Sequence, residues 1–210
     1  MARTIFAKST NVERLARTPF SDGAWARGQY GATISAGISA INLEKLDQTQ
    51  SNENRLLETT EGFVWQKFEL AKGIIWPVDM NVSFSYNDEN KMLKWNGMLQ
   101  HSFFQRPLLP SIAVRADYSK LYNNQDLNSS NYSLALASSW GYRFVHLFAS
   151  RNENLNSQES AKYNLDLISH SSTDQLGLQI NMNPLSKVSF SKTWENGQTI
   201  SNEIKVSVGL

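Results

Sequence analysis

Cysteine is absent from this chain of 210 residues, which excludes disulfide bonds, thiol nucleophiles and cysteine-ligated zinc. An excess of one charge sign is missing too, because 20 basic residues face 19 acidic ones and leave a formal net charge of +1. A chain this balanced has no global field that would attract a nucleic acid, so we expect no nucleic-acid partner.

Long apolar runs and metal-binding motifs are also missing. The uninterrupted apolar runs are only a few residues long, whereas a membrane-spanning helix needs about 20. The sequence holds no glycine-rich phosphate loop and no histidine–aspartate cluster at metal-ligand spacing, so we expect no cofactor and no metal. Strands, in contrast, can cross a membrane in a chain that looks hydrophilic overall, because half of each strand faces a polar interior.

From residue 28 onward the chain alternates between apolar and polar residues with a period of two. In "PVDMNVSFSYN" (77–87), the even positions from 78 to 86 are apolar and the odd positions are polar. Repeats of this pattern predict about ten strands between residues 28 and 210. Segment 61–73 is apolar on both phases and is compatible with a strand or a helix, and 163–167 is assigned to a loop. Residues 1–27 are expected to form either a tail or a segment folded beneath or into a barrel.

The connections between the expected strands fall into two kinds. Short turns are predicted near residues 73–75, 105–108, 140–142 and 183–186. The remaining connections, several of them long and polar, are predicted at 44–60, 87–90, 120–130, 151–172 and 195–199. The two kinds alternate along the chain and leave both termini on the side of the short turns. This layout is typical of an all-β, antiparallel, up-and-down transmembrane β-barrel.

The apolar face of the expected strands carries aromatic residues near both ends, where a bilayer interface favours tryptophan and tyrosine. The residues predicted to form these two girdles are Trp65, Trp76, Tyr86, Trp95, Tyr118, Tyr132, Trp140, Tyr142 and Trp194. The apolar face between the girdles is predicted to contact lipid through Val78, Met80, Val82, Phe84, Ile112, Val114, Leu134, Leu136, Leu178, Ile180, Val206 and Val208.

The polar face is rich in Ser, Thr, Gly, Ala and Asn and poor in charge, which suits a confined lumen better than the exposed face of a soluble protein. Its charged residues are expected to form acid–base contacts, because a buried charge is tolerated only with a partner. This lumen charge network is predicted to contain Asp79, Arg115, Asp117, Lys187, Glu203 and Lys205. A soluble β-sandwich or ligand-binding barrel is the alternative fold, since it shares the alternation.

The C-terminal stretch "NEIKVSVGL" resembles the last strand of bacterial outer-membrane β-barrel proteins. It places apolar residues at 204, 206, 208 and 210, although Leu210 stands where that family usually ends in Phe or Trp. The resemblance covers about 28–210. It implies periplasmic turns, external loops, the outer-membrane bilayer as main partner, and a signal peptide already removed, because residues 1–17 lack an apolar core followed by a cleavage site.

More faintly, "KGIIWPVDMNVSFSY" is similar to small barrels of the fatty-acid-transporter type. Those proteins carry an N-terminal plug with an Asn-Pro-Ala motif, which does not occur within residues 1–60. Transport of small hydrophobic molecules is therefore a secondary hypothesis.

The three histidines, at positions 101, 146 and 170, offer little catalytic chemistry in sequence. His170 and Ser172, in "SHSST", resemble the His-x-Ser pair of barrel-type lipid A deacylases. No glutamate follows within the next 20 residues to orient the base, and a general base needs such a positioned partner. The other two histidines fall within expected strands and lack the paired aspartates of omptin-like proteases. We therefore expect no enzymatic activity.

Together these patterns favour a non-enzymatic, integral outer-membrane barrel with a structural role or a narrow pore for small solutes. A barrel of eight to ten strands encloses an interior that its own side chains largely fill. The alternative is adhesion or ligand binding through the external loops, of which 44–60 and 151–172 are expected to be the longest.

Overall fold

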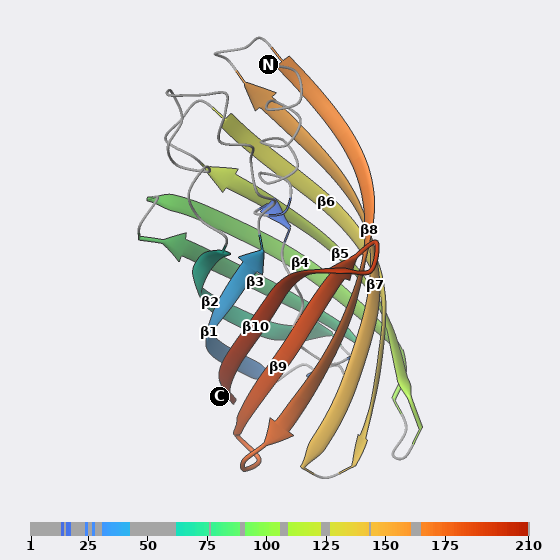
Figure 1. Ribbon diagram of the computed structural model, residues 1–210. Helices are drawn as coiled ribbons and strands as arrows, with labels where there is room; N and C mark the ends of the chain where they lie inside the picture. Colours follow the sequence, from blue (N-terminus) through green and yellow to red (C-terminus); the bar gives the residue numbers. More distant parts are fainter. Residues whose placement is uncertain are drawn as a thin grey trace.

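Ten β-strands make up almost all of the described structure, in agreement with the predicted number (Figure 1). The computed structural model describes residues 14, 16–17, 24, 27, 31–42, 62–75, 77–88, 91–105, 109–122, 127–142, 144–160 and 165–209. The strands are β1 (Ala32–Asn42), β2 (Gly62–Ile75), β3 (Val78–Asn87), β4 (Met92–Phe104), β5 (Ser111–Tyr122), β6 (Leu127–Tyr142), β7 (Val145–Ser160), β8 (Leu165–Asn181), β9 (Ser186–Glu195) and β10 (Gln198–Gly209). Within the described residues, no helix is both long and apolar enough to cross a membrane.

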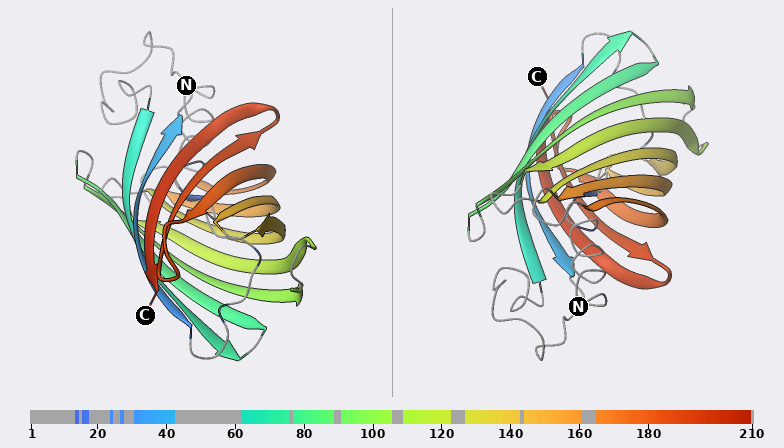
Figure 2. Two further views of the ribbon diagram at one scale, coloured as in Figure 1. Left: turned by 90° about the horizontal axis from the view of Figure 1, so that it is seen from below. Right: turned by 90° about the horizontal axis from the view of Figure 1, so that it is seen from above.

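The strands form a closed barrel in which every neighbour is antiparallel. Each strand pairs with the next along the chain, and β1 closes the ring against β10, from Thr33 opposite Gly209 to Ile41 opposite Ser201. Both views of Figure 2 show the strands tilted and curving around a common interior. This is the predicted up-and-down topology, and a closed barrel excludes the β-sandwich alternative.

The barrel has two distinct ends. The first strand begins and the last strand ends at one of them, which we call the turn end, together with the connections 76–77, 105–110, 143–144 and 182–185. The other end, which we call the loop end, holds the connections 43–61, 88–91, 123–126, 161–164 and 196–197. The connections therefore alternate between the two ends of the barrel as predicted. The start of β1 and the end of β10 both lie at the turn end.

One open alternative is settled and one expectation was wrong. Segment 61–73, which was compatible with a strand or a helix, lies in the strand β2, where buried and exposed side chains alternate. The predicted loop 151–172 is mostly strand, because β7 continues to Ser160 and β8 begins at Leu165. The sequence does not show this long hairpin, because its residues are polar on both faces. Two strands pair through backbone hydrogen bonds, so a pair such as Asn154 and Ser171 needs no apolar side chain.

Burial in this barrel is inverted relative to a soluble protein. Most large apolar side chains lie outside, with Ile38 56%, Phe68 61% and Leu136 60% exposed. Several charged side chains lie inside, where Arg115 and Lys205 are each only 1% exposed. All twelve residues that were predicted to face lipid lie on the outward face, seven of them exposed and five half-buried.

The aromatic residues follow the predicted girdles in part. Tyr86, Tyr132 and Trp140 are exposed on the outward face, while Trp95, Tyr118 and Trp194 are half-buried there. Tyr118 connects three strands, with its ring centroid 5.2 Å from that of Trp95 and 4.8 Å from that of Tyr132. Trp76 and the side chain of Tyr142 lie outside the described residues.

Trp65 was wrongly assigned to a girdle. It is 1% exposed and lies inside the barrel, where it packs with Phe63, Ile41, Met92 and Leu121 near the loop end. The error has a physical reason: β2 is apolar on both phases, so its alternation does not reveal which face is outward.

Candidate functional site: the closed lumen

Four charged side chains form a buried ion-pair chain inside the barrel. Lys205 Nζ lies 3.0 Å from Glu69 Oε1, and Lys67 Nζ lies 3.4 Å from Glu69 and 3.3 Å from Glu203 Oε1. Gly37 of β1 stands between them, because it is the cross-strand partner of both Lys67 and Lys205. With no side chain at that position, residues of β2 and β10 can reach one another across β1.

The predicted charge network is only partly represented in this chain of ion pairs. Glu203 and Lys205 belong to it, but Lys67 and Glu69 were missed because they lie in β2, where the alternation is obscured. The alternating burial within β2, once its pairing is known, is the signal that identifies them.

The other predicted members of the network lie elsewhere. Arg115 donates from Nε to Gln100 Oε1 at 2.7 Å, and Asp117 accepts from Asn96 Nδ2 at 3.2 Å. Lys187 lies half-buried at the turn end, where β9 begins.

Asp79, the last predicted member, binds the N-terminal part of the chain. It is fully buried and accepts hydrogen bonds from the backbone N–H of Arg27 at 3.1 and 2.9 Å, one to each carboxylate oxygen. The Arg27 guanidinium lies 3.4 Å from the same carboxylate, and its Nε donates to Thr33 Oγ1 at 2.7 Å. Both partners lie at the turn end.

Further described residues of the same segment continue along the interior from the turn end. The Ala24 carbonyl accepts from Ser102 Oγ at 2.7 Å and the Ala24 N–H donates to Ser139 Oγ at 2.9 Å, both in the turn-end half of the barrel. Nearer the loop end, Ser119 Oγ donates to the Ala16 carbonyl at 2.6 Å. We call Arg14, Ala16, Arg17, Ala24 and Arg27 the lumen segment.

The lumen segment is also fixed by charge at the loop end. Arg17 lies 2.6 Å from Glu195 Oε1, and Arg14 lies 3.6 Å from Glu195 Oε2. Lys94 Nζ donates to the Arg17 carbonyl at 2.9 Å. Of the two expectations for residues 1–27, these contacts favour the segment inside a barrel.

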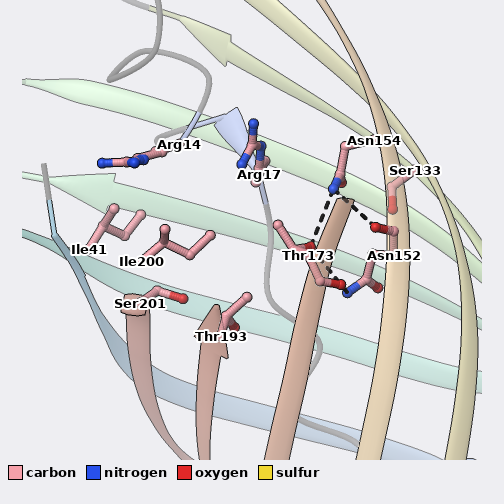
Figure 3. Close-up of a pocket in the computed structure, with 10 residues that line it drawn as sticks. All are labelled: Arg14, Arg17, Ile41, Ser133, Asn152, Asn154, Thr173, Thr193, Ile200 and Ser201. Atoms are coloured by element: carbon pink, nitrogen blue, oxygen red, sulfur yellow. Dashed lines mark hydrogen bonds between the residues drawn. The ribbon is translucent and has the colours of Figure 1, made fainter. Parts of the chain in front are cut away.

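One wall of the lumen carries no Asp, Glu, Lys or Arg, and we call it the uncharged wall. At the described inward positions of β6, β7 and β8, most side chains are Ser, Asn, Thr, Gln and Ala, together with Phe148, which lies beside Gly177, and His146 near the turn end. This wall faces a cavity of about 20 Å³, room for a water molecule or two. The cavity, shown in Figure 3, is lined by Arg14, Arg17, Ile41, Ser133, Asn152, Asn154, Thr173, Thr193, Ile200 and Ser201.

The arginines and the uncharged wall lie on different sides of the cavity (Figure 3). On the uncharged side, Asn152 Nδ2 donates to the Thr173 carbonyl at 3.3 Å, and Asn154 Nδ2 donates to Thr173 Oγ1 at 3.3 Å. The two arginines come from the lumen segment. The cavity is thus the place where the N-terminal part of the chain meets the uncharged wall.

The outward face carries a second polar group of residues, on β7 and β8. His170 Nε2 lies 3.7 Å from Glu153 Oε2, and Arg151 Nε lies 3.5 Å from Glu153 Oε1. Ser172 is the cross-strand partner of Glu153 and faces outward like His170. No glutamate follows His170 closely in the sequence, but Glu153 of the neighbouring strand β7 lies beside it in the structure.

Comparison with known proteins gives a likeness in structure only. No protein-family model and no curated protein matches the chain. Among solved structures, the attachment invasion locus protein Ail of Yersinia pestis is 12% identical, covering 87% of this chain and 99% of that one, with a TM-score of 0.37. OprG of Pseudomonas aeruginosa is 9% identical over 89% of this chain and 92% of its own, with a TM-score of 0.39.

The outer membrane protease OmpT of Escherichia coli is similar to the same degree. It is 8% identical, covers 85% of this chain and 94% of its own, and has a TM-score of 0.37. Identities this low and TM-scores below 0.5 carry no inference about what the present chain binds or does.

Proposed function

We propose that this chain is an integral outer-membrane β-barrel whose interior is closed by its own N-terminal segment. The inverted burial supports this proposal most directly. Exposed Ile, Leu, Val and Phe side chains surround a closed barrel whose inside holds ion pairs. Water would leave that apolar surface unburied at a cost of roughly 25 cal/mol per Å², whereas a bilayer solvates it.

A charge placed on the outward face tests the membrane proposal. Ile204→Arg, in the middle of β10, is expected to lower the free energy of unfolding in phospholipid vesicles by about 2–4 kcal/mol, the cost of a basic residue near the bilayer midplane. Gln198→Arg is the matched control, exposed at the loop end of the same strand, and should cost about 0–1 kcal/mol. Urea titrations followed by tryptophan fluorescence measure both values.

The soluble alternative gives the opposite result. An exposed isoleucine on a water-soluble barrel tolerates arginine, so equal stabilities for Ile204→Arg and Gln198→Arg would contradict the membrane proposal.

Within that membrane protein, we infer a passive role: envelope structure, or a narrow pore for small solutes. The lumen segment and the ion pairs fill the interior of a ten-stranded barrel, which fits low conductance rather than a wide channel. The alternative of adhesion was based on two long external loops, 44–60 and 151–172. Most of 151–172 is a β-hairpin and not a loop, and 44–60 lies outside the described residues.

A second candidate function is supported by the outward group on β7 and β8. Glu153 Oε2 lies 3.7 Å from Nε2 of His170, and Ser172 lies on the same outward face, so an acid, a base and a hydroxyl share a face that a lipid would contact. Such a set can hydrolyse an ester when the histidine takes the proton of the serine as the serine oxygen attacks the carbonyl carbon, and gives that proton to the departing alcohol. The histidine then activates a water that releases the fatty acid from the acyl-serine and restores the hydroxyl. Leu155 and Ile168, both exposed beside His170, offer apolar contact for an acyl chain.

Ester hydrolysis is tested directly with lipid substrates. If the outward group is catalytic, the purified barrel in mixed micelles releases fatty acid from phospholipid or lipid A, and Ser172→Ala lowers that rate at least about 100-fold while the barrel stays folded. Ser157→Ala, a half-buried serine on the outward face of β7, is the matched control. Equal rates of fatty-acid release for the wild type and Ser172→Ala would contradict a catalytic role of Ser172 in ester hydrolysis.

A further inference from the structure

The outward face of β7 and β8 carries charged side chains in the middle of two long strands. Arg151 and Asp174 are cross-strand partners with side chains 65% and 66% exposed, and Arg151 Nη1 lies 3.9 Å from Asp174 Oδ1. Glu153 and His170, with side chains 47% and 67% exposed, lie beside them toward the loop end. We call these four residues the charged patch.

The charged patch lies at a depth where the neighbouring strand faces lipid. A strand tilted by about 40° climbs roughly 2.5 Å per residue, so Arg151 lies about 17 Å above Phe144, an exposed residue of the turn before β7. The apolar band of an outer-membrane barrel is about 25 Å tall. Leu136, the cross-strand partner of Arg151 on β6, is itself exposed. Because a charge that faces acyl chains is strongly destabilising, the patch requires a partner other than hydrocarbon.

Acidic residues separate a protein partner from a lipid headgroup. At the described outward positions of the strands, the acids are Glu153, Glu159 and Asp174, and all three lie on β7 and β8. Anionic headgroups attract basic side chains and repel carboxylates, so a surface for lipid phosphate would carry an excess of Arg and Lys. A patch with both signs is instead complementary to a protein surface with both signs.

A second copy of the chain presents such a surface. In a dimer whose two-fold axis runs along the membrane normal between Arg151 and Asp174, β7 of each copy faces β8 of the other at that height. Each Arg151 then meets the Asp174 of the second copy, and two intermolecular ion pairs form out of contact with lipid. Toward the turn end, Ala149 and its cross-strand partner Ser138 have small side chains, which lets the two barrel walls approach closely.

We propose that the outward face of β7 and β8 is a dimerisation surface for a second copy of this chain, with Arg151 and Asp174 in reciprocal contact across a two-fold axis. This inference rests on the proposed membrane barrel, because only a bilayer makes exposed charges costly at this depth. A second barrel on this face keeps lipid away from His170 and Ser172, so dimerisation is the alternative to ester hydrolysis there.

Cross-linking of the full chain in phosphatidylcholine vesicles, at a low ratio of protein to lipid, detects the dimer. The chain has no cysteine, so Ala149→Cys introduces a single thiol beside the proposed axis, and a short bis-maleimide links it to its copy. Ala36→Cys is the matched control, on the outward face of β1 with β9 and β10 between it and β8. Cross-linked dimer is expected from Ala149→Cys and not from Ala36→Cys.

Charge reversal tests the reciprocal contact. In the Ala149→Cys background, Arg151→Glu leaves two acids and Asp174→Arg leaves two bases at the axis, so each variant repels its own copy. Each is expected to lower the cross-linked fraction at least about ten-fold. Mixed in the same vesicles, the two variants are complementary and should form a heterodimer at about the unreversed level, which a tag on one chain identifies by mass.

A third variant keeps the test independent of folding defects in the single reversals. Arg151→Glu, Asp174→Arg in one chain exchanges the two charges, retains the pair within the chain and stays complementary to its own copy. In the Ala149→Cys background it should cross-link with itself as well as Ala149→Cys alone does.

Several results would overturn the dimer. Equal cross-linking of Ala149→Cys and Ala36→Cys means random collision, and undiminished cross-linking in both single reversals excludes the contact between Arg151 and Asp174. Failure of both the mixture and the exchanged variant to cross-link excludes it too. If Ala149→Cys gives no dimer and Arg151→Glu abolishes binding of lipid A, the patch belongs to anionic headgroups. All these results leave the membrane barrel in place, whereas a chain that does not insert into vesicles overturns that proposal as well.

Discussion

Replacing Lys205 with methionine is expected to lower the free energy of unfolding by about 3–5 kcal/mol, the usual cost of removing one partner of a buried ion pair. The ammonium group of Lys205 lies 3.0 Å from Glu69, and both side chains are almost completely buried, at 1% and 4% exposure. Methionine fills a similar volume. It leaves Glu69 and Glu203 to share Lys67, so one carboxylate loses its compensation.

The double variant Lys205→Met, Glu69→Leu should recover most of that loss. It removes one acid and one base together, and the remaining pair between Lys67 and Glu203, at 3.3 Å, is balanced. Replacing a complete buried pair with apolar residues of similar size is often neutral or stabilising. A double-mutant cycle in urea, in detergent micelles, measures the coupling between the two positions.

The matched control for the single variant is Lys192→Met. Lys192 lies on the outward face of β9, with its ammonium group 5.6 Å from the centroid of the Trp194 ring. Its replacement should change the free energy of unfolding by less than about 1 kcal/mol. If Lys205→Met costs no more than Lys192→Met, the interior of the barrel is hydrated enough to screen its charges, and the buried ion-pair chain does not determine stability.

Alternation between apolar and polar residues is what made the barrel predictable from sequence. It is a property of single strands, and β3 shows it clearly, since its odd positions from Asp79 to Asn87 are all buried and its even positions face out. The strict order of turns and loops added the topology. Neither signal requires a tertiary contact, which is why both could be read correctly without one.

Contacts between distant segments were not predictable in the same way. The pairing of Glu69 with Lys205 depends on Gly37, a residue of a third strand that lets two long side chains meet. Glu153 reaches His170 because β7 continues through residues that the sequence presents as a polar loop. In both contacts, the register of the paired strands decides which residues meet. The residue types along one strand do not specify that register.

The N-terminal segment is the least predictable part of the candidate site. Residues 14–27 show no alternation in sequence, and many contacts of the lumen segment are made by backbone groups, such as the Ala16 carbonyl and the Ala24 N–H. Backbone donors and acceptors are the same in every residue, so a sequence does not reveal where they bind. The arginines of this segment are the one feature of its sequence that agrees with the acidic partners seen in the structure, Asp79 and Glu195.

Replacing Asp79 with alanine is expected to open the barrel. Asp79 is the turn-end anchor of the lumen segment, since both of its oxygens accept the Arg27 N–H and one lies 3.4 Å from the guanidinium. Hydrogen bonds to a buried carboxylate are worth about 1.5–3 kcal/mol each. Loss of 2–3 kcal/mol from the closed state raises the fraction of open barrels roughly 30- to 150-fold.

Single-channel recordings in planar bilayers measure this effect. The wild type is expected to stay mostly closed with low conductance, and Asp79→Ala to show frequent, larger openings. Asp88→Ala is the matched control, because Asp88 lies exposed at the loop end beyond β3. Large and steady conductance in the wild type would contradict the closed lumen outright.

A cysteine pair then shows whether the lumen segment itself is what moves. The chain has no cysteine of its own, so Ala24→Cys, Ser139→Cys introduces the only two thiols. The Ala24 N–H lies 2.9 Å from Ser139 Oγ, which places the two positions within reach of a disulfide or a short thiol cross-linker. In the Asp79→Ala background, cross-linking should restore the closed state and cleavage of the link should reopen it. The cross-linked and uncross-linked barrels could instead conduct equally well. In that case movement of the lumen segment does not cause the openings, and Asp79 stabilises the barrel wall and not the lumen segment.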